Sequence, residues 1–299
     1  MKKINALLQY LFGVFLSKET KDKSEKITVY IAIISFLVHL GIIALVNLNL
    51  IEVNDHSKLL TNPISAIYTP FSFVLVYEVY LLLYYLPKST SIYIGKQYEI
   101  ISLIVIRRIF KDLSNLELSS DWFSIKYDIL FTYDLVAILI LFWLIYLYYN
   151  LVKSNAKLNA AKSNPEIVTF IKLKQNIATC LLPVLLLLSI YSFGDWFYES
   201  FFSLSKFAKD FSDINKIFFD DFFTILILVD VLLLIYSFLH SDKFNKVIRN
   251  SGFIISTILI KLSFSTTGLV NIVLILVSLL FGVLIFKIHN LYEKLEIEN

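Results

Sequence analysis

The chain has only one cysteine, Cys180, and only seven glycines and five prolines among its 299 residues. A single cysteine excludes an intramolecular disulfide and a metal site built from several thiolates. The scarcity of glycine and proline excludes collagen-like, linker-like and low-complexity segments. We therefore expect one compact unit without a separate soluble module.

The sequence also lacks the common enzyme signatures. It contains no HExxH zinc helix, no GxSxG nucleophile elbow and no Walker-type phosphate loop, and its four histidines are scattered. A TVGYG potassium filter is missing as well. The net charge of +3 is spread over loops, which argues against a nucleic-acid partner. We infer no cofactor from the sequence, favour a protein that is not an enzyme, and leave a metal open.

Apolar residues are abundant instead. They make up 58% of the chain, against roughly 45 to 50% in soluble domains. Five apolar stretches are each close to the 17 to 25 residues that a membrane helix requires: 27–48, 64–86, 128–149, 177–193 and 219–239. The pattern predicts an all-α, polytopic integral membrane bundle of six to eight segments.

Two further regions decide the number of segments. Residues 92–110 mix charges with a short apolar centre. Residues 253–287 would reach about 50 Å as one helix, against about 30 Å of hydrocarbon. The sequence from Ser265 to Gly268 offers a break, so we expect a short helix over 253–264 and a crossing over 269–287.

The distribution of lysines predicts the orientation. The segments 1–26 and 151–176 carry six and five lysines, and 240–252 adds three basic residues, so all three should be cytoplasmic. Residues 151–176 can lie in the cytoplasm only if residues 92–110 also cross the membrane. The chain then has eight membrane segments. Six crossings plus interfacial helices is the main competitor.

The predicted organisation has three parts. Residues 1–26 form a cytoplasmic segment that begins with an amphipathic helix at the membrane interface, 27–287 form one transmembrane domain, and 288–299 form a short tail. High Lys, Ile, Asn and Phe usage is compatible with an AT-rich bacterial genome. We therefore expect a multi-pass protein of a bacterial inner membrane with a cytoplasmic N-terminus.

Two membrane segments carry an acidic residue near their centre, Glu78 and Asp230. When the segments are aligned on these acids, the halves 27–150 and 177–287 match weakly, as a parallel internal repeat would. Basic residues follow the acids by 29 to 31 positions in both halves, namely Arg107, Arg108 and Lys261. We expect these bases to neutralise the acids across neighbouring helices.

A rival alignment sets Asp134 against Asp221. Apolar segments also match by composition alone, so the repeat stays one of two interpretations.

Ionisable groups at membrane depth are costly and usually face a bundle interior or a water-filled cavity. The candidate ion or proton path consists of Glu78, Asp230, Glu99, Arg107, Arg108, Lys261 and Asp134. The first hypothesis is a transporter or channel-like protein that conducts or exchanges protons or small cations. His39 lies in an apolar stretch and is expected to be a hydrogen-bonded packing residue.

Two alternatives belong to other classes. In the first, a structural or signalling membrane subunit uses buried charges to fix helix packing. In the second, a lipid-acting enzyme holds a divalent ion near the acidic helix starts at Asp128, Asp134, Asp220 and Asp221. The expected partners are the lipid bilayer and either further copies of the chain or other membrane subunits.

Overall fold

The computed structural model describes residues 2–50, 62–113, 126–158, 165–201, 214–238 and 244–298, and every regular element in these ranges is a helix. The elements are α1 (Lys2–Phe15), α2 (Lys18–Asn47), the 3-10 helix η1 (Pro63–Ile67), α4 (Tyr68–Tyr85), α5 (Thr90–Leu113), α6 (Lys126–Leu158), α7 (Pro165–Phe201), α8 (Ile214–Phe238), α9 (Phe244–Phe264) and α10 (Leu269–Glu298). The predicted all-α class is confirmed for this part of the chain.

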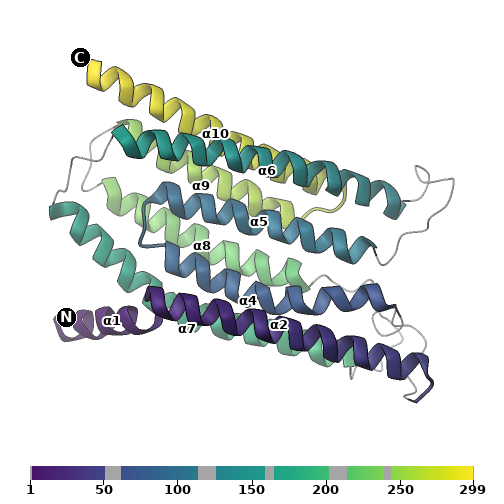
Figure 1. The fold of residues 1–299 in the computed structure, drawn as a ribbon. Coiled ribbons are helices and arrows are strands. Elements are labelled where there is room, and N and C mark those ends of the chain that lie inside the picture. Colours follow the sequence, from purple (N-terminus) through teal and green to yellow (C-terminus); the bar gives the residue numbers. More distant parts are fainter. Residues whose placement is uncertain are drawn as a thin grey trace.

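The long helices lie side by side with roughly parallel axes and alternating directions (Figure 1). The N-terminus and the C-terminus therefore lie at the same end of the bundle. The described parts of the three lysine-rich segments 1–26, 151–176 and 240–252 belong to that end too, because α2, α7 and α9 all start there. The distribution of lysines predicted this common end, on the condition that residues 92–110 cross the bundle. Helix α5, which contains these residues, runs alongside the other long helices.

Each half of the chain packs its helices in sequence order. Helix α2 contacts α4, α4 contacts α5, and α5 contacts α6; likewise α7 contacts α8, α8 contacts α9, and α9 contacts α10. The halves are joined by contacts of α6 with α10, of α4 with α7 and of α5 with α9. This order suits two four-helix halves, while a sequence duplication stays a prediction.

Within the described residues, six helical segments are long and apolar enough to cross a membrane: α2, η1 with α4, α6, α7, α9 and α10. Four of the five spans predicted first are among them. The fifth, 219–239, is helical as α8, although α8 is outside these six, as is the charged helix α5.

The break near Gly268 is confirmed. Helix α9 ends at Phe264, and Gly268 adopts the left-handed backbone conformation with φ +67°, which costs glycine little. The expected short helix over 253–264 is wrong at its start, however, because α9 begins at Phe244. Its polar first turns are covered by α10, which continues helically from Leu269 to Glu298.

The N-terminal helix packs against α7. Gln9 Nε2 donates to Asn176 Oδ1 over 2.8 Å, while Ile4, Leu7 and Tyr10 are exposed. Ser17 caps the next helix by accepting from the Thr20 amide over 3.1 Å. Helix α2 then runs without interruption through residue 26 to Asn47.

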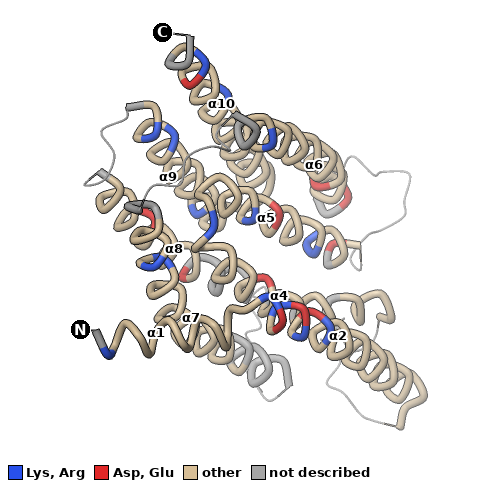
Figure 2. Tube along the Cα trace, turned by 60° about the vertical axis from the view of Figure 1, so that its left-hand side comes forward, with Lys and Arg blue, Asp and Glu red and all other residues tan. Residues whose placement is uncertain are grey.

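Helices α2 and α5 show opposite surroundings. Among the described helices, α2 packs mainly against α4 and η1, and it exposes apolar side chains along its length, as expected of a helix that faces lipid. Its charged residues gather in its first turns, whereas α5 carries charges along its whole length (Figure 2). Helix α5 nevertheless buries Tyr98, Ile101 and Val105, so it is an inner helix and not one lying on the surface.

Candidate functional site

Helix α5 directs polar side chains toward several neighbours at once. Arg107 and Arg108 lie near its end, and Lys96, Gln97 and Glu99 lie near its start. Because successive residues differ by about 100° around a helix, adjacent polar residues reach different partner helices. Three separate polar groups result, and they contain five of the seven predicted path residues, all except Glu99 and Lys261.

The first group is the Arg108 fork. Arg108 Nε and Nη2 donate to the two carboxylate oxygens of Asp134 on α6, over 2.5 and 2.6 Å. Arg108 Nη1 donates to Asn271 Oδ1 on α10 over 2.5 Å, and Asn271 Nδ2 donates to the Ser263 carbonyl. Asp134 is only 1% exposed. This bidentate geometry holds three helices together and leaves the carboxylate neutralised.

The second group joins α4 and α5 through Glu78 and Arg107. Both side chains are buried, and Arg107 supplies the positive charge that acts on the Glu78 carboxylate. The neutralisation of Glu78 by Arg107 stays a prediction. Arg108, the other predicted partner, serves Asp134 instead.

The third group, here named the Asp230 cluster, consists of Gln97, Lys174, Asp230 and Thr257. Gln97 Nε2 donates to Asp230 Oδ2 over 3.4 Å, and Thr257 Oγ1 donates to Gln97 Oε1 over 2.9 Å. Gln97 and Thr257 are 0% exposed and Asp230 is 8% exposed. The cluster joins α5, α8 and α9, so Asp230 is held by a long hydrogen bond from a neutral amide.

Lys174 of α7 supplies a positive charge that acts on the Asp230 carboxylate. Its side chain is buried, its Nζ donates to the Lys88 carbonyl over 3.3 Å, and its ammonium lies 5.0 Å from the centre of the Phe170 ring. Within the described residues, neither Lys174 nor Asp230 forms an ion pair within 4 Å. The acid is thus compensated at a distance and is not locked into a salt bridge.

The structure does not bring Lys261 to Asp230, contrary to our expectation. Lys261 is partly exposed near the end of α9, and no ion pair involves it in the part of the chain that the structure describes. The charge that acts on Asp230 comes from Lys174.

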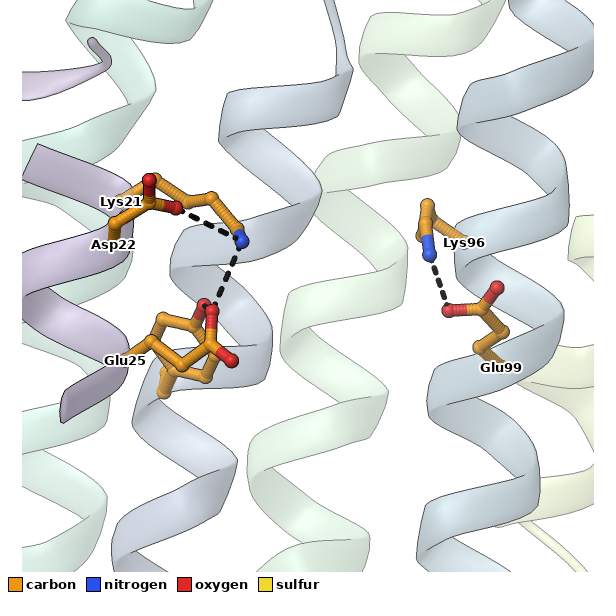
Figure 3. Close-up of polar contacts among 6 residues, drawn as sticks. Lys21, Asp22, Glu25, Lys96 and Glu99 are labelled. Carbon is orange, nitrogen blue, oxygen red and sulfur yellow. Dashed lines mark hydrogen bonds and ion pairs between the residues drawn. The ribbon is translucent and has the colours of Figure 1, made fainter. Parts of the chain in front are cut away.

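Glu99 lies near the edge of the bundle. Its carboxylate accepts from Lys96 Nζ over 2.6 Å and from Tyr149 Oη over 2.5 Å, and its side chain is 36% exposed. Figure 3 shows this pair on α5 and a separate group on α2, where Lys21 bonds Asp22 and Glu25. Both groups are at the lysine-rich end of the bundle, so Glu99 is a poor candidate for an interior path.

The sequence argument missed Gln97 and Thr257, which are neutral, and Lys174, which was counted as part of a loop. Helix α7 begins at Pro165 and carries Lys174 into the bundle. The apolar residues that recur at helical spacing around Lys174 would have been a signal, because they extend the helix backward from the predicted span.

The remaining candidates are the acidic helix starts and His39. No group of three or more His, Cys, Asp or Glu residues suited to a metal occurs among the described residues. Asp128 is buried and Asp221 is exposed, while the side chain of Asp220 lies outside the described ones. His39 Nδ1 lies 2.5 Å from Thr69 Oγ1, which fits the expected packing histidine.

Comparison with protein-family models, with curated proteins and with solved structures finds no match for this chain. Function must therefore be argued from the residues and their geometry.

Proposed function

We propose that the chain is a multi-pass membrane protein with eight crossings, including α5 and α8, and with both termini in the cytoplasm. The lysine-rich ends of α2, α7 and α9 support this orientation. The charges of α5 meet partners within the bundle, which lowers the cost of placing that helix in a membrane. Lysine, isoleucine, asparagine and phenylalanine usage favours a bacterial inner membrane.

We propose further that this protein translocates protons, with Asp230 as the residue that binds and releases them. The observation that carries the proposal is the Asp230 carboxylate, which is buried, weakly bonded to Gln97 and outside any direct ion pair with Lys174. An acid in this setting can exist both with and without a proton, since no bidentate partner fixes its charge. Buried carboxylates of this kind serve as proton relays in pumps and transporters.

Lys174 favours a proton over a small metal cation as the transported species. A sodium or potassium ion beside Asp230 would be repelled by the neighbouring ammonium, because the low dielectric of the interior strengthens like-charge repulsion. A proton removes the charge of Asp230 and leaves Gln97 able to bond the neutral acid. We therefore place the proton before the small cations in this proposal.

A structural or signalling subunit is the second candidate, and the Arg108 fork favours it. The fork joins α5, α6 and α10 through charges that are fully hydrogen-bonded. Buried polar networks of this kind can specify one helix arrangement without any transport. Under this candidate the Asp230 cluster would also be a packing element.

Proton flux into liposomes that contain the purified protein tests the proposal. We expect Asp230→Asn to reduce flux to the level of empty liposomes, while Glu99→Gln, a matched change at an acid near the edge of the bundle, leaves flux unchanged. Thermal stability in detergent is measured for both variants. Equal flux through wild type and Asp230→Asn would overturn the proposal, and a loss of stability or of complex recovery without any wild-type flux would favour the structural subunit.

A further inference from the structure

His289 of α10 lies in a second group of polar side chains, apart from the Asp230 cluster. It is 1% exposed. Its Nδ1 lies 3.2 Å from the Asn245 carbonyl oxygen, and its Nε2 lies 3.2 Å from Arg249 Nη1 and 3.5 Å from Glu293 Oε1. Asn245 and Arg249 belong to the first turns of α9, which lie against the later turns of α10. The imidazole therefore lies between a cation of one helix and a carboxylate of its own helix.

The contacts determine the protonation state of this imidazole. The Asn245 carbonyl can only accept, so Nδ1 must carry a hydrogen. The Arg249 guanidinium can only donate, so Nε2 must offer its lone pair. Both contacts are satisfied together only by a neutral imidazole with its hydrogen on Nδ1. In the structure, His289 is consequently the acceptor of Arg249 and not the ion-pair partner of Glu293.

We propose that His289 is a proton-binding site whose imidazole exchanges Arg249 for Glu293 when it takes up a proton. In this step a proton from water adds to Nε2, and an Nε2–H bond forms. The hydrogen bond from Arg249 Nη1 is lost, because both groups are then donors. The new Nε2–H donates to Glu293 Oε1, which lies one helical turn further along the same face. Glu293 is the route for the proton, since its side chain is 13% exposed.

Neighbouring groups can bond the imidazole of His289 both when it is neutral and when it is protonated. Burial opposes a positive charge on His289, as do Arg249 and Lys246 on α9, whereas Glu293 on α10 favours it. Tyr148 of α6 acts on Arg249. Asn245 Oδ1 is buried without a hydrogen-bond partner in the described part of the chain, and it lies one turn before Arg249. It offers an acceptor for the guanidinium that His289 releases, so the exchange need not leave a buried donor without a partner.

The same charges connect His289 to the Asp230 cluster. Arg249 acts on Lys174, and Lys174 acts on Asp230. A proton that arrives at His289 and displaces Arg249 therefore changes the field at Asp230 through one intermediate cation. In this respect the inference rests on the proposed function, because it places a second proton site between Asp230 and the lysine-rich end of the bundle.

Histidine-selective NMR of the full chain in nanodiscs tests this site. We expect the imidazole signal that disappears in His289→Gln to titrate with a midpoint below the ordinary histidine value of about 6.5, because burial and Arg249 oppose its positive charge. In Glu293→Gln the signal should titrate at lower pH, because the acceptor for the protonated form has lost its charge. His39→Gln is the matched control, and it should leave the His289 titration unchanged.

Two outcomes would overturn the inference: a His289 signal that stays neutral down to the lowest pH at which the protein remains folded, and a titration that Glu293→Gln does not alter. Proton flux through the same variants separates the two proposals. A normal His289 titration with equal flux through wild type and Asp230→Asn would refute the transport proposal and leave the His289 site standing. Full flux dependence on Asp230 with no titration of His289 would do the reverse.

Discussion

The two halves of the bundle handle a buried acid in different ways. In the first half, Arg108 forms a bidentate fork with Asp134, and Arg107 on the same helix supplies a positive charge that acts on Glu78 of α4. In the second half, Asp230 of α8 forms no ion pair within the described residues, and it accepts a hydrogen bond from a neutral amide of the other half. The first half has the features of a rigid frame, whereas the second contains an acid whose charge can change.

The position of the bases along their helices does not explain the difference. Arg107 and Lys261 are each the eighteenth residue of their helix, α5 and α9. Their surroundings differ instead, because Arg107 is buried and Lys261 is partly exposed.

Removing Arg108 should have the largest effect, and it tests whether the first half is a frame. We expect Arg108→Leu to destabilise the protein by about 3 to 5 kcal/mol, because Asp134 would remain buried without its charge partner. Thermal unfolding in detergent measures the change. The double variant Arg108→Leu with Asp134→Leu should recover most of the loss. If the single and double variants were equally unstable, the charge pairing would not be the cause.

The seam between the halves offers the next test. A Cβ at Gly282 of α10 would overlap the Tyr98 hydroxyl of α5, which bonds Ser256 of α9 over 2.8 Å. We expect Gly282→Ala to cost about 1 to 3 kcal/mol through overpacking. Gly41→Ala is the control, since nothing lies within 4 Å of its added Cβ, and it should stabilise helix α2 by about 0.5 to 1 kcal/mol. Melting temperatures that fall equally in both would argue against tight packing at the seam.

Lys174→Met should weaken the selectivity of Asp230 for a proton over a sodium ion. Without the ammonium, sodium can approach the carboxylate, so we expect it to inhibit proton flux at about a tenfold lower concentration, equal to about 1.4 kcal/mol. Flux assays at several sodium concentrations measure this shift. The matched variant Glu99→Gln should keep the wild-type response. An unchanged sodium response in Lys174→Met would contradict the selectivity argument.

Lys96→Met should have the smallest effect. The Lys96–Glu99 pair is partly exposed on both sides, and such pairs contribute about 0.2 to 1 kcal/mol. We expect a change in melting temperature well below that of Arg108→Leu. A comparable loss would mean that charges near the edge also belong to the frame.

Hydropathy and charge bias predicted the helical class, the break before α10 and the common end of the lysine-rich segments, because these depend on composition along the chain. The partners of the acids were harder to predict. Arg107 was found because its helix follows α4 directly, whereas Lys174 approaches Asp230 from a helix that precedes α8. Gln97 and Thr257 carry no charge, so only their burial beside Asp230 makes them recognisable. The start of α9 was missed because Asn245 and Arg249 look like loop residues until α10 covers them.

The short turn at Ser265–Gly268 also bears on how the chain would enter a membrane during synthesis. Helix α9 is less apolar than α10, and it carries Arg249 and Lys261. A nascent α9 would therefore pause at the translocon with little tendency to partition into lipid. Because only four residues separate it from α10, and because Gly252 packs directly against Ile285, we expect the two to leave the translocon together as a preformed hairpin.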